Sequence, residues 1–264
     1  MHIQKDQLVF HCAALVSFDA SDTDRLFCVN VNGTENIVNA CLLKGVKKLI
    51  YCSSTAAVGK LEGGSLTYET QEWDEKDLPS NYSRSKYYAE LEVWRGIEEG
   101  LNAVIVNPAI IFGPCDWNKA SGRFFMNANN NLPFYTNGSN GFVYVKDVAR
   151  AMILLSDRNI TNERFLLVGQ NMSFRNFMNC ISDTLGKKRP SVKVSPFFLG
   201  IIWRFAKFIN LFSGVKSMLT RESAASSIKN ISYSNQKIKD AIQFEFTEIN
   251  TAIDETVRSF NKDL

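Results

Sequence analysis

The chain has 264 residues and a mass of 29.8 kDa, enough for one large domain or for a domain with a small cap. Hydrophobic residues make up 45% and charged residues 22%, which excludes collagen-like and disordered classes. The 30 basic and 27 acidic residues leave a net charge of +3. Such a balance gives no overall field that favours nucleic acid as a partner.

Cysteine and histidine usage limits redox and metal chemistry. The six cysteines are scattered without a Cys-x-x-Cys pair, in a chain far longer than disulfide-stapled miniproteins. We therefore expect reduced cysteines and a cytoplasmic protein. With His2 and His11 as the only histidines, we expect neither a metal site nor a Ser-His-Asp triad.

No segment predicts a membrane span or a secretory signal. Residues 1–7 are polar, and the apolar run that follows them is too short for a signal sequence. Residues 196–212 are the most apolar stretch, but Arg204 and Lys207 interrupt it, short of the roughly 20 apolar residues that a spanning helix needs. We expect this stretch to pack in the core, with an apolar substrate wall and membrane-surface association as alternatives.

The first part of the chain alternates between strand and helix patterns. Apolar runs typical of buried parallel strands occur at residues 8–14, 46–52 and 103–106. Between them, helices are predicted at residues 21–44 and 80–99. Residues 60–79 are polar and predict a loop. Strands joined by helices predict an α/β fold with a parallel sheet and right-handed crossovers.

The second part is expected to contain more helix. Residues 119–139 predict a loop on the substrate side, around an Asn-rich segment. Strands are predicted at residues 141–145 and 164–168, with a helix at residues 146–156 between them. Helices are then predicted at residues 173–185, 217–227, 234–242 and 247–260. We therefore expect a sheet domain over residues 1–172 and a helical substrate-binding cap over residues 173–264.

The clearest chemical pattern is YSRSK, which begins at Tyr82 and ends at Lys86. Residues four apart on a helix lie on the same face, so Lys86 is expected to lower the pKa of Tyr82 from about 10. Such a tyrosine can act as general acid or base between a carbonyl and an alcohol. The pattern alone is common on exposed helices. It gains weight because the strand that ends at Ser53 and Ser54 should open onto the same crevice.

Six segments together resemble a known family. They are VFHCAA, NVNGTENIVNAC, GVKKLIYCSSTAAVG, YSRSKYYAE, NPAIIFGP and FVYVKDVARA, in family order over about residues 8–170. With them the chain resembles the extended short-chain dehydrogenase/reductase family, in its NAD-dependent epimerase/dehydratase and dihydroflavonol-reductase or 3β-hydroxysteroid-dehydrogenase-like group. The resemblance implies a Rossmann-like fold, NAD or NADP as cofactor, and oxidoreductase activity on a small-molecule substrate.

The resemblance also implies roles for individual residues. Tyr82 matches the catalytic acid/base, and Lys86 matches the lysine that holds the nicotinamide ribose. Ser54, in preference to Ser53, matches the residue that positions the substrate oxygen. The cofactor-binding positions are Cys12, Ala13, Ala14, Val16, Tyr82, Lys86, Pro108, Ala109 and Ile110. Three further matches are expected to be structural, namely Asn30, Asn32 and, as a cap of its own helix, Asp147.

Two departures from the family pattern bear on function. The Gly-rich turn that binds the pyrophosphate does not occur in these residues, and the first glycine is Gly33 in a predicted helix. We therefore expect an N-terminally truncated Rossmann-like domain, lacking about 60 residues, or two βαβ units' worth. Nucleotide-sugar members of the family also carry an arginine that binds the diphosphate. Here Asn140 or Gly141 stands at that position, and Arg123 is a candidate to take over its role.

Three hypotheses about function follow. The first is an NAD(P)-dependent oxidoreductase with a Ser-Tyr-Lys site, and the second is a nucleotide-sugar epimerase or dehydratase on the same fold. The third is an inactive truncated paralogue or fragment without dinucleotide binding. The missing arginine favours the first over the second. Helices 21–44 and 80–99 resemble those through which the family dimerises, so a homodimer is a further hypothesis.

Overall fold

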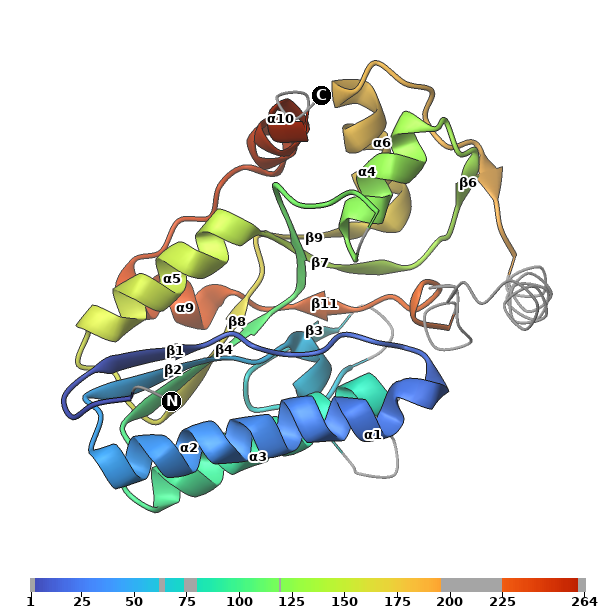
Figure 1. Ribbon diagram of the computed structural model, residues 1–264. Helices are drawn as coiled ribbons and strands as arrows, with labels where there is room; N and C mark the ends of the chain where they lie inside the picture. Colours follow the sequence, from blue (N-terminus) through green and yellow to red (C-terminus); the bar gives the residue numbers. More distant parts are fainter. Residues whose placement is uncertain (1–2, 62–64, 74–79, 119, 196–224, 261–264) are drawn as a thin grey trace.

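A four-stranded parallel sheet forms the centre of the computed structural model, which describes residues 3–61, 65–73, 80–118, 120–195 and 225–260 (Figure 1). Its strands are β1 (Leu8–His11), β2 (Lys48–Cys52), β4 (Ala103–Pro108) and β8 (Glu163–Leu167), in the order β1-β2-β4-β8. The two central strands are almost wholly buried, as expected of a parallel sheet covered on both faces. The predicted α/β class with a parallel sheet is confirmed.

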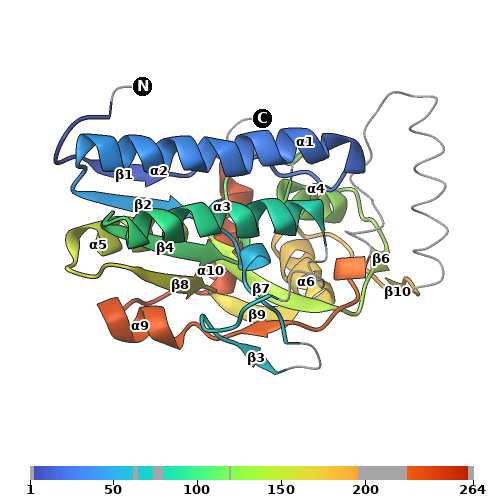
Figure 2. The same cartoon turned by 90° about the horizontal axis from the view of Figure 1, so that it is seen from below.

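Helices cover both faces of this sheet. On one face, α2 (Gly33–Lys44) and α3 (Asn81–Glu98) run side by side and bury Val38 and Val93 against Leu49 of β2 (Figures 1 and 2). On the other face, α5 (Val145–Asp157) and α9 (Gln236–Ile242) bury Leu155 and Ile238 against the same strands. The sheet therefore presents only its strand ends and its edges to a ligand.

The first predicted helix forms, but it is not uniform. After the short helices η1 (Ala20–Asp22) and α1 (Thr23–Leu26), residues Phe27–Asn32 form a π-helix, η2, that leads into α2. Gly45 ends α2 in the left-handed conformation, with φ of 62°. Ser80 caps α3, because its hydroxyl accepts a hydrogen bond from the Ser83 amide. Short π-helical segments inside helices are frequent at functional sites.

A second core lies beyond the carboxyl ends of the strands. It is built on a three-stranded sheet of β5 (Ile110–Phe112), β7 (Ser139–Tyr144) and β9 (Gln170–Ser173). Helices α4 (Gly122–Asn129), α6 (Phe174–Thr184) and α10 (Ile249–Phe260) pack against it through a cluster that includes Phe125, Phe142 and Phe177. The prediction of a loop over residues 119–139 is wrong for α4, because the buried Phe125 and Ala128 fix an amphipathic helix there.

The residues after position 173 divide between the two cores. Strand β11 (Ser232–Tyr233) pairs with β3 (Leu66–Thr67), and α9 packs on the first sheet. The predicted cap over residues 173–264 is therefore corrected for these two elements, while the boundary at residue 172 stays a prediction. Strands β6 (Phe134–Tyr135) and β10 (Val192–Lys193) pair at the far end. Residues 196–212 and most of the predicted helix at 217–227 lie outside the described residues.

Candidate active site

Ser53 and Ser54 leave the end of β2 toward different partners. Ser54 is extended and caps the short helix η3 (Thr55–Ala57), accepting a hydrogen bond from the Ala56 amide at 3.1 Å. Its hydroxyl also lies close enough to Tyr82 to lower the pKa of the phenol. Ser53 instead donates to the buried Glu90 carboxylate at 2.6 Å. Of the two serines, Ser54 is thus the one beside the tyrosine.

Tyr82 lies in the first turn of α3, with its ring edge-on to Phe18 at a centroid distance of 5.6 Å. Burial raises the pKa of Tyr82 above its ordinary value of about 10, and this outweighs the lowering by Lys86 and by the Ser54 hydroxyl. The expectation of a net lowering is therefore wrong for this structure. Helical spacing predicts the neighbouring lysine but says nothing of the depth at which the phenol lies.

Lys86 lies one turn further along α3 and is almost fully buried. Its Nζ donates to the Tyr51 hydroxyl at 3.0 Å and to the Cys52 carbonyl at 3.1 Å. Burial raises the pKa of Tyr51, which keeps that phenol neutral as an acceptor. The sequence predictions did not include Tyr51, although a polar residue inside the buried strand sequence KLIYC was a signal for it. Lys86 therefore ties α3 to the end of β2.

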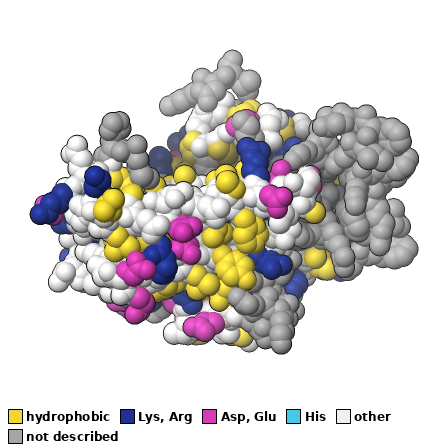
Figure 3. Space-filling view, turned by 60° about the horizontal axis from the view of Figure 1, so that its bottom comes forward, with side chains coloured by type: hydrophobic (Ala, Val, Ile, Leu, Met, Phe, Trp, Pro, Cys, Tyr) yellow, Lys and Arg dark blue, Asp and Glu magenta, His cyan; other side chains and the backbone are white. Residues whose placement is uncertain are grey.

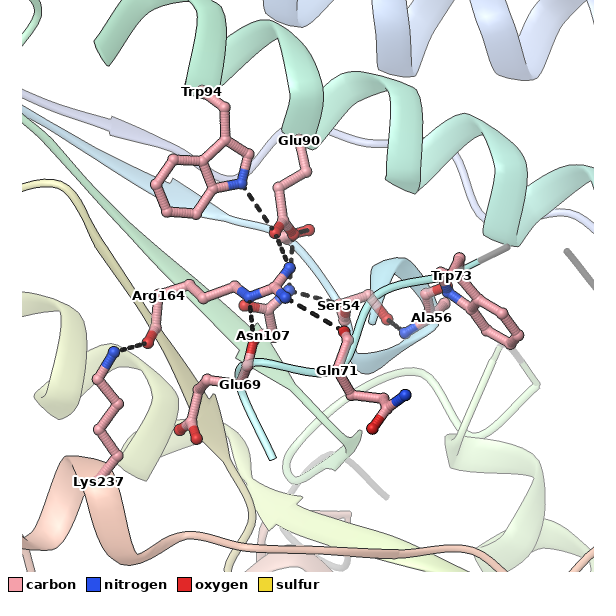
Figure 4. Close-up of polar contacts among 11 residues, drawn as sticks. Ser54, Ala56, Glu69, Gln71, Trp73, Glu90, Trp94, Asn107, Arg164 and Lys237 are labelled. Atoms are coloured by element: carbon pink, nitrogen blue, oxygen red, sulfur yellow. Dashed lines mark hydrogen bonds and ion pairs between the residues drawn. The ribbon is translucent and has the colours of Figure 1, made fainter. Parts of the chain in front are cut away.

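Glu90, one more turn along the same face of α3, is the centre of a buried polar network (Figure 4). Its carboxylate accepts hydrogen bonds from Ser53 at 2.6 Å and from Asn107 Nδ2 at 2.7 Å. It also pairs with Arg164 Nη1 at 3.1 Å and accepts from Trp94 Nε1 at 3.4 Å. Residues of β2, α3, β4 and β8 are thereby joined at one point.

The network extends to the segment that covers η3. Arg164 donates from Nε to the Glu69 carbonyl at 2.6 Å and from Nη2 to the Gln71 carbonyl at 3.2 Å (Figure 4). Trp73 Nε1 donates to the Ala56 carbonyl at 3.2 Å. Asn107 Nδ2 reaches the Ser54 carbonyl at 3.1 Å.

Sequence reasoning missed this network. Its one sequence signal was the four-residue spacing of Glu90 from Lys86, which places Tyr82, Lys86 and Glu90 on one face of α3. Asn107 and Arg164 could be found only from the order of the strands.

The loop after β1 carries the first group of predicted cofactor residues. Cys12, Ala13, Ala14 and Val16 are exposed here. Asn30 is buried in the π-helix, and its side-chain amide accepts from the Leu15 amide at 2.7 Å and donates to the Leu15 carbonyl at 3.0 Å. Asn30 Nδ2 also donates to Ser85 on α3 at 2.9 Å. The structural role predicted for Asn30 is confirmed, because it fastens this loop to α3.

The second group consists of Pro108, the last residue of β4, Ala109, and Ile110, the first residue of β5. Behind it, a Cβ added at Gly141 would lie 2.9 Å from the Cβ of Ala109 and 2.8 Å from Val168 Cγ1. No arginine side chain fits at position 141. Arg123 is exposed on α4 and donates to the Asn118 carbonyl at 3.0 Å.

Asp147 has a structural role that differs from the predicted one. It does not cap α5 but is buried and accepts hydrogen bonds from the amide and the hydroxyl of Thr247, both at 2.8 Å. It also pairs with Arg150 at 2.9 Å. Asp147 therefore fastens the segment before α10 to α5.

The fold and this arrangement define an extended short-chain dehydrogenase/reductase, with a tyrosine, a lysine and a serine at the carboxyl end of a parallel sheet. The chain belongs to the 3-beta hydroxysteroid dehydrogenase/isomerase family, whose model matches residues 2–194. The predicted resemblance to this group is confirmed. Among the described residues, no helix has both the length and the apolar composition that a bilayer span requires.

Similar proteins cover a range of activities. "Sterol demethylase protein B" of Methylococcus capsulatus is 30% identical over 192 residues, which are 71% of this chain and 58% of that protein. The chain therefore spans little more than half of that relative. The crystal structure of gox2253 is 31% identical, with a TM-score of 0.83, over 98% of this chain and 80% of that one.

A nucleotide-sugar enzyme is also similar in structure. UDP-N-acetylglucosamine 4-epimerase from Methanobrevibacter ruminantium, in complex with UDP-N-acetylmuramic acid, is 25% identical with a TM-score of 0.77. The match covers 98% of this chain and 78% of that one.

Proposed function

We propose that this chain is an NAD(P)-dependent oxidoreductase that interconverts a carbonyl and an alcohol. The observation that carries the proposal is the Tyr82 phenol, whose pKa is acted on by both buried Lys86 and the Ser54 hydroxyl. A bound NAD or NADP would supply or accept the hydride, and solved structures of this fold contain NAD. The chain's own residues handle the proton and the substrate oxygen.

Tyr82 exchanges the proton at its hydroxyl oxygen, and Ser54 orients the substrate oxygen by a hydrogen bond. Because burial raises the pKa of Tyr82, the phenol is protonated at neutral pH and suits proton donation to a carbonyl that is being reduced. In the reverse direction the charge of Lys86 stabilises the phenolate that accepts the proton. Both directions therefore use the same three side chains.

The residues present fit one half of a dinucleotide. Lys86, residues 12–16 and residues 108–110 lie around the end of the sheet where the nicotinamide and its ribose would bind. For the pyrophosphate, these 264 residues hold no Gly-rich turn. The alternative hypothesis of a chain without dinucleotide binding is therefore tested by direct titration with the cofactor.

We propose an apolar substrate, in preference to a nucleotide sugar. Neither Asn140 nor the packed Gly141 supplies a diphosphate-gripping arginine, and the relative named as a sterol demethylase protein supports an apolar class. The similarity to the UDP-N-acetylglucosamine 4-epimerase keeps a nucleotide-sugar epimerase as second candidate. Mass spectrometry of the denatured, purified protein separates them, since a retained nucleotide sugar would favour the epimerase.

Turnover of a Tyr82→Phe variant tests the catalytic assignment. A panel of 3β-hydroxysteroids and dihydroflavonols is assayed through the absorbance of the reduced nicotinamide, with NAD(H) and NADP(H). Tyr82→Phe should lose at least about 100-fold in turnover, as expected for a positioned general acid. Tyr88→Phe makes the same chemical change at another position of α3 and is the matched control. Equal turnover in Tyr82→Phe and the unmodified chain would contradict the assignment.

We also propose a homodimer through the helices at residues 21–44, which end in η2 and α2, and at residues 80–99, which include α3, in a cytoplasmic protein. Figure 3 shows hydrophobic side chains among charged ones on the face that these helices form. Its exposed apolar residues include Val29, Leu43 and Leu91. Light scattering on a sizing column should give twice the chain mass, and Leu91→Glu should halve it. All six cysteines are free thiols, which suits a reducing compartment.

A further inference from the structure

Two cysteines lie side by side at the ends of β1 and β2. These strands are parallel and their last paired residues are His11 and Tyr51, so that Cys12 and Cys52 directly follow the last pair. Neighbouring strands lie about 4.8 Å apart, within the Cα separation of about 4.4–6.8 Å that a disulfide spans. Side chains alternate along a strand, so both thiols lie on the sheet face opposite to His11 and Tyr51. The two thiols are close enough for each to shift the pKa of the other.

In this pair, Cys12 is readily deprotonated to the reactive thiolate, whereas Cys52 stays a protonated thiol. The hydrogen bond from Cys52 and the charge of Lys86 lower the pKa of Cys12 to about 7, against the opposing effect of burial. The same hydrogen bond and burial raise the pKa of Cys52. Cys12 is exposed, whereas Cys52 is half-buried behind it. Burial instead raises the pKa of the thiols of Cys41, Cys115 and Cys180. An accessible thiolate beside a second thiol is the arrangement of a redox-active pair.

We propose that Cys12 and Cys52 are a modification site, at which a peroxide forms a reversible disulfide that weakens cofactor binding. The Cys12 thiolate attacks the O–O bond of hydrogen peroxide, forming a sulfenic acid and releasing hydroxide, which takes up a proton as water. The Cys52 sulfur then attacks the Cys12 sulfur, the S–S bond forms and the hydroxyl leaves as a second water. Two thiols are oxidised, one peroxide is reduced, and a dithiol reverses the reaction by exchange.

The position of the pair connects it to the candidate active site. The Cys52 carbonyl accepts a hydrogen bond from Lys86 at 3.1 Å, and Cys12 begins the exposed loop over residues 12–16. A disulfide would remove the thiolate beside Lys86 and restrain the start of that loop. Weaker cofactor binding by the oxidised form rests on the proposed function, whereas formation of the disulfide does not.

Peptide mapping of the whole chain after peroxide treatment tests the chemical step. We expect a Cys12–Cys52-linked peptide that disappears after dithiothreitol, and a loss of two titratable thiols. In Cys52→Ser, dimedone should label Cys12 as a sulfenic acid, whereas Cys12→Ser should form neither product. Cys115→Ser, which removes another exposed thiol, should oxidise as the unmodified chain does. Because the unmodified chain is mapped directly, the result does not depend on the folding of a variant.

Two outcomes overturn the inference. One is the absence of the Cys12–Cys52 peptide at peroxide doses that oxidise Cys28 or Cys115. The other is a disulfide that leaves the affinity for NADH within a factor of about two, against an expected loss of at least about tenfold, or 1.4 kcal/mol. If the reduced chain binds no NADH while the disulfide still forms, the proposed function fails and so does the predicted effect on cofactor binding. The redox pair itself would be retained.

Discussion

The two strand ends that form the candidate site are held very differently. At the end of β2, Ser53 and Ser54 are fixed by a buried network that includes Glu90 and Asn107. At the end of β1, residues 12–16 are mostly exposed and are fastened chiefly through Asn30. The chain therefore holds the residues that we propose for proton transfer through buried contacts, whereas the loop that we propose for cofactor binding is held by fewer contacts. Precise supporting contacts around reacting groups, with mobile binding loops, are a usual division in enzymes.

Removal of the Glu90 carboxylate should weaken the buried network that holds the end of β2. Glu90→Ala leaves the half-buried Arg164 charge without its carboxylate partner and Ser53 without its acceptor. We expect the free energy of unfolding in urea to fall by about 3–5 kcal/mol. Glu92→Ala, on the same helix, breaks only a surface pair with Arg95 and should cost at most about 1 kcal/mol. Equal losses in the two variants would show that the network does not hold the site.

Asn30 is the corresponding test at the other strand end. Asn30→Ala removes both bonds to Leu15 and the bond to Ser85, and should cost about 1–3 kcal/mol of unfolding free energy. Hydrogen exchange of the Leu15 amide should accelerate more than that of the amides in β2. Asn39→Ala, which loses only an exposed bond to Arg95, is the control. An unchanged Leu15 exchange rate would mean that the loop is held by other contacts.

The smallest effect concerns His11, whose ring lies under the loop and contacts Thr34 at 3.0 Å. Burial first, and then the charge of Lys86, lower the pKa of His11 from 6.5 to about 4. Between these values the unfolded chain binds a proton that the folded chain does not, so stability falls as the pH decreases from about 6.5 to about 4. These two values give a loss of at most about 2 kcal/mol at pH 5. His11→Gln should reduce this loss, and an identical pH dependence in both proteins would contradict the assignment.

The sequence predicted the parts of this molecule that depend on local pattern. The strands at β1, β2 and β4 follow from apolar runs, and Gly45 marks the end of α2. It did not predict α4, because an Asn-rich composition resembles a loop while Phe125 supplies the helix with a buried face. The Arg164–Glu90 pair joins residues far apart in the chain, and no local pattern reveals it.

In the candidate site too, local patterns predicted which residues come together but not how deeply they are buried. Sequence spacing grouped Tyr82 with Lys86, and the strand end added Ser54, which the structure places beside the tyrosine. The sign of the Tyr82 pKa shift could not be predicted, because it depends on how deeply the ring is packed against the rest of the fold. Burial is a property of the whole chain, whereas the effect of Lys86 is local.

Fluorescence titration of the purified chain with NADH and NADPH tests the central claim most directly. The account predicts saturable binding in the micromolar range to the reduced protein, with the tighter of the two coenzymes identifying the cofactor. Lys86→Met should weaken this binding, whereas Tyr88→Phe should not. Circular dichroism and cooperative urea unfolding establish that each sample is folded. No binding by a folded sample would contradict the claim that these residues hold a dinucleotide.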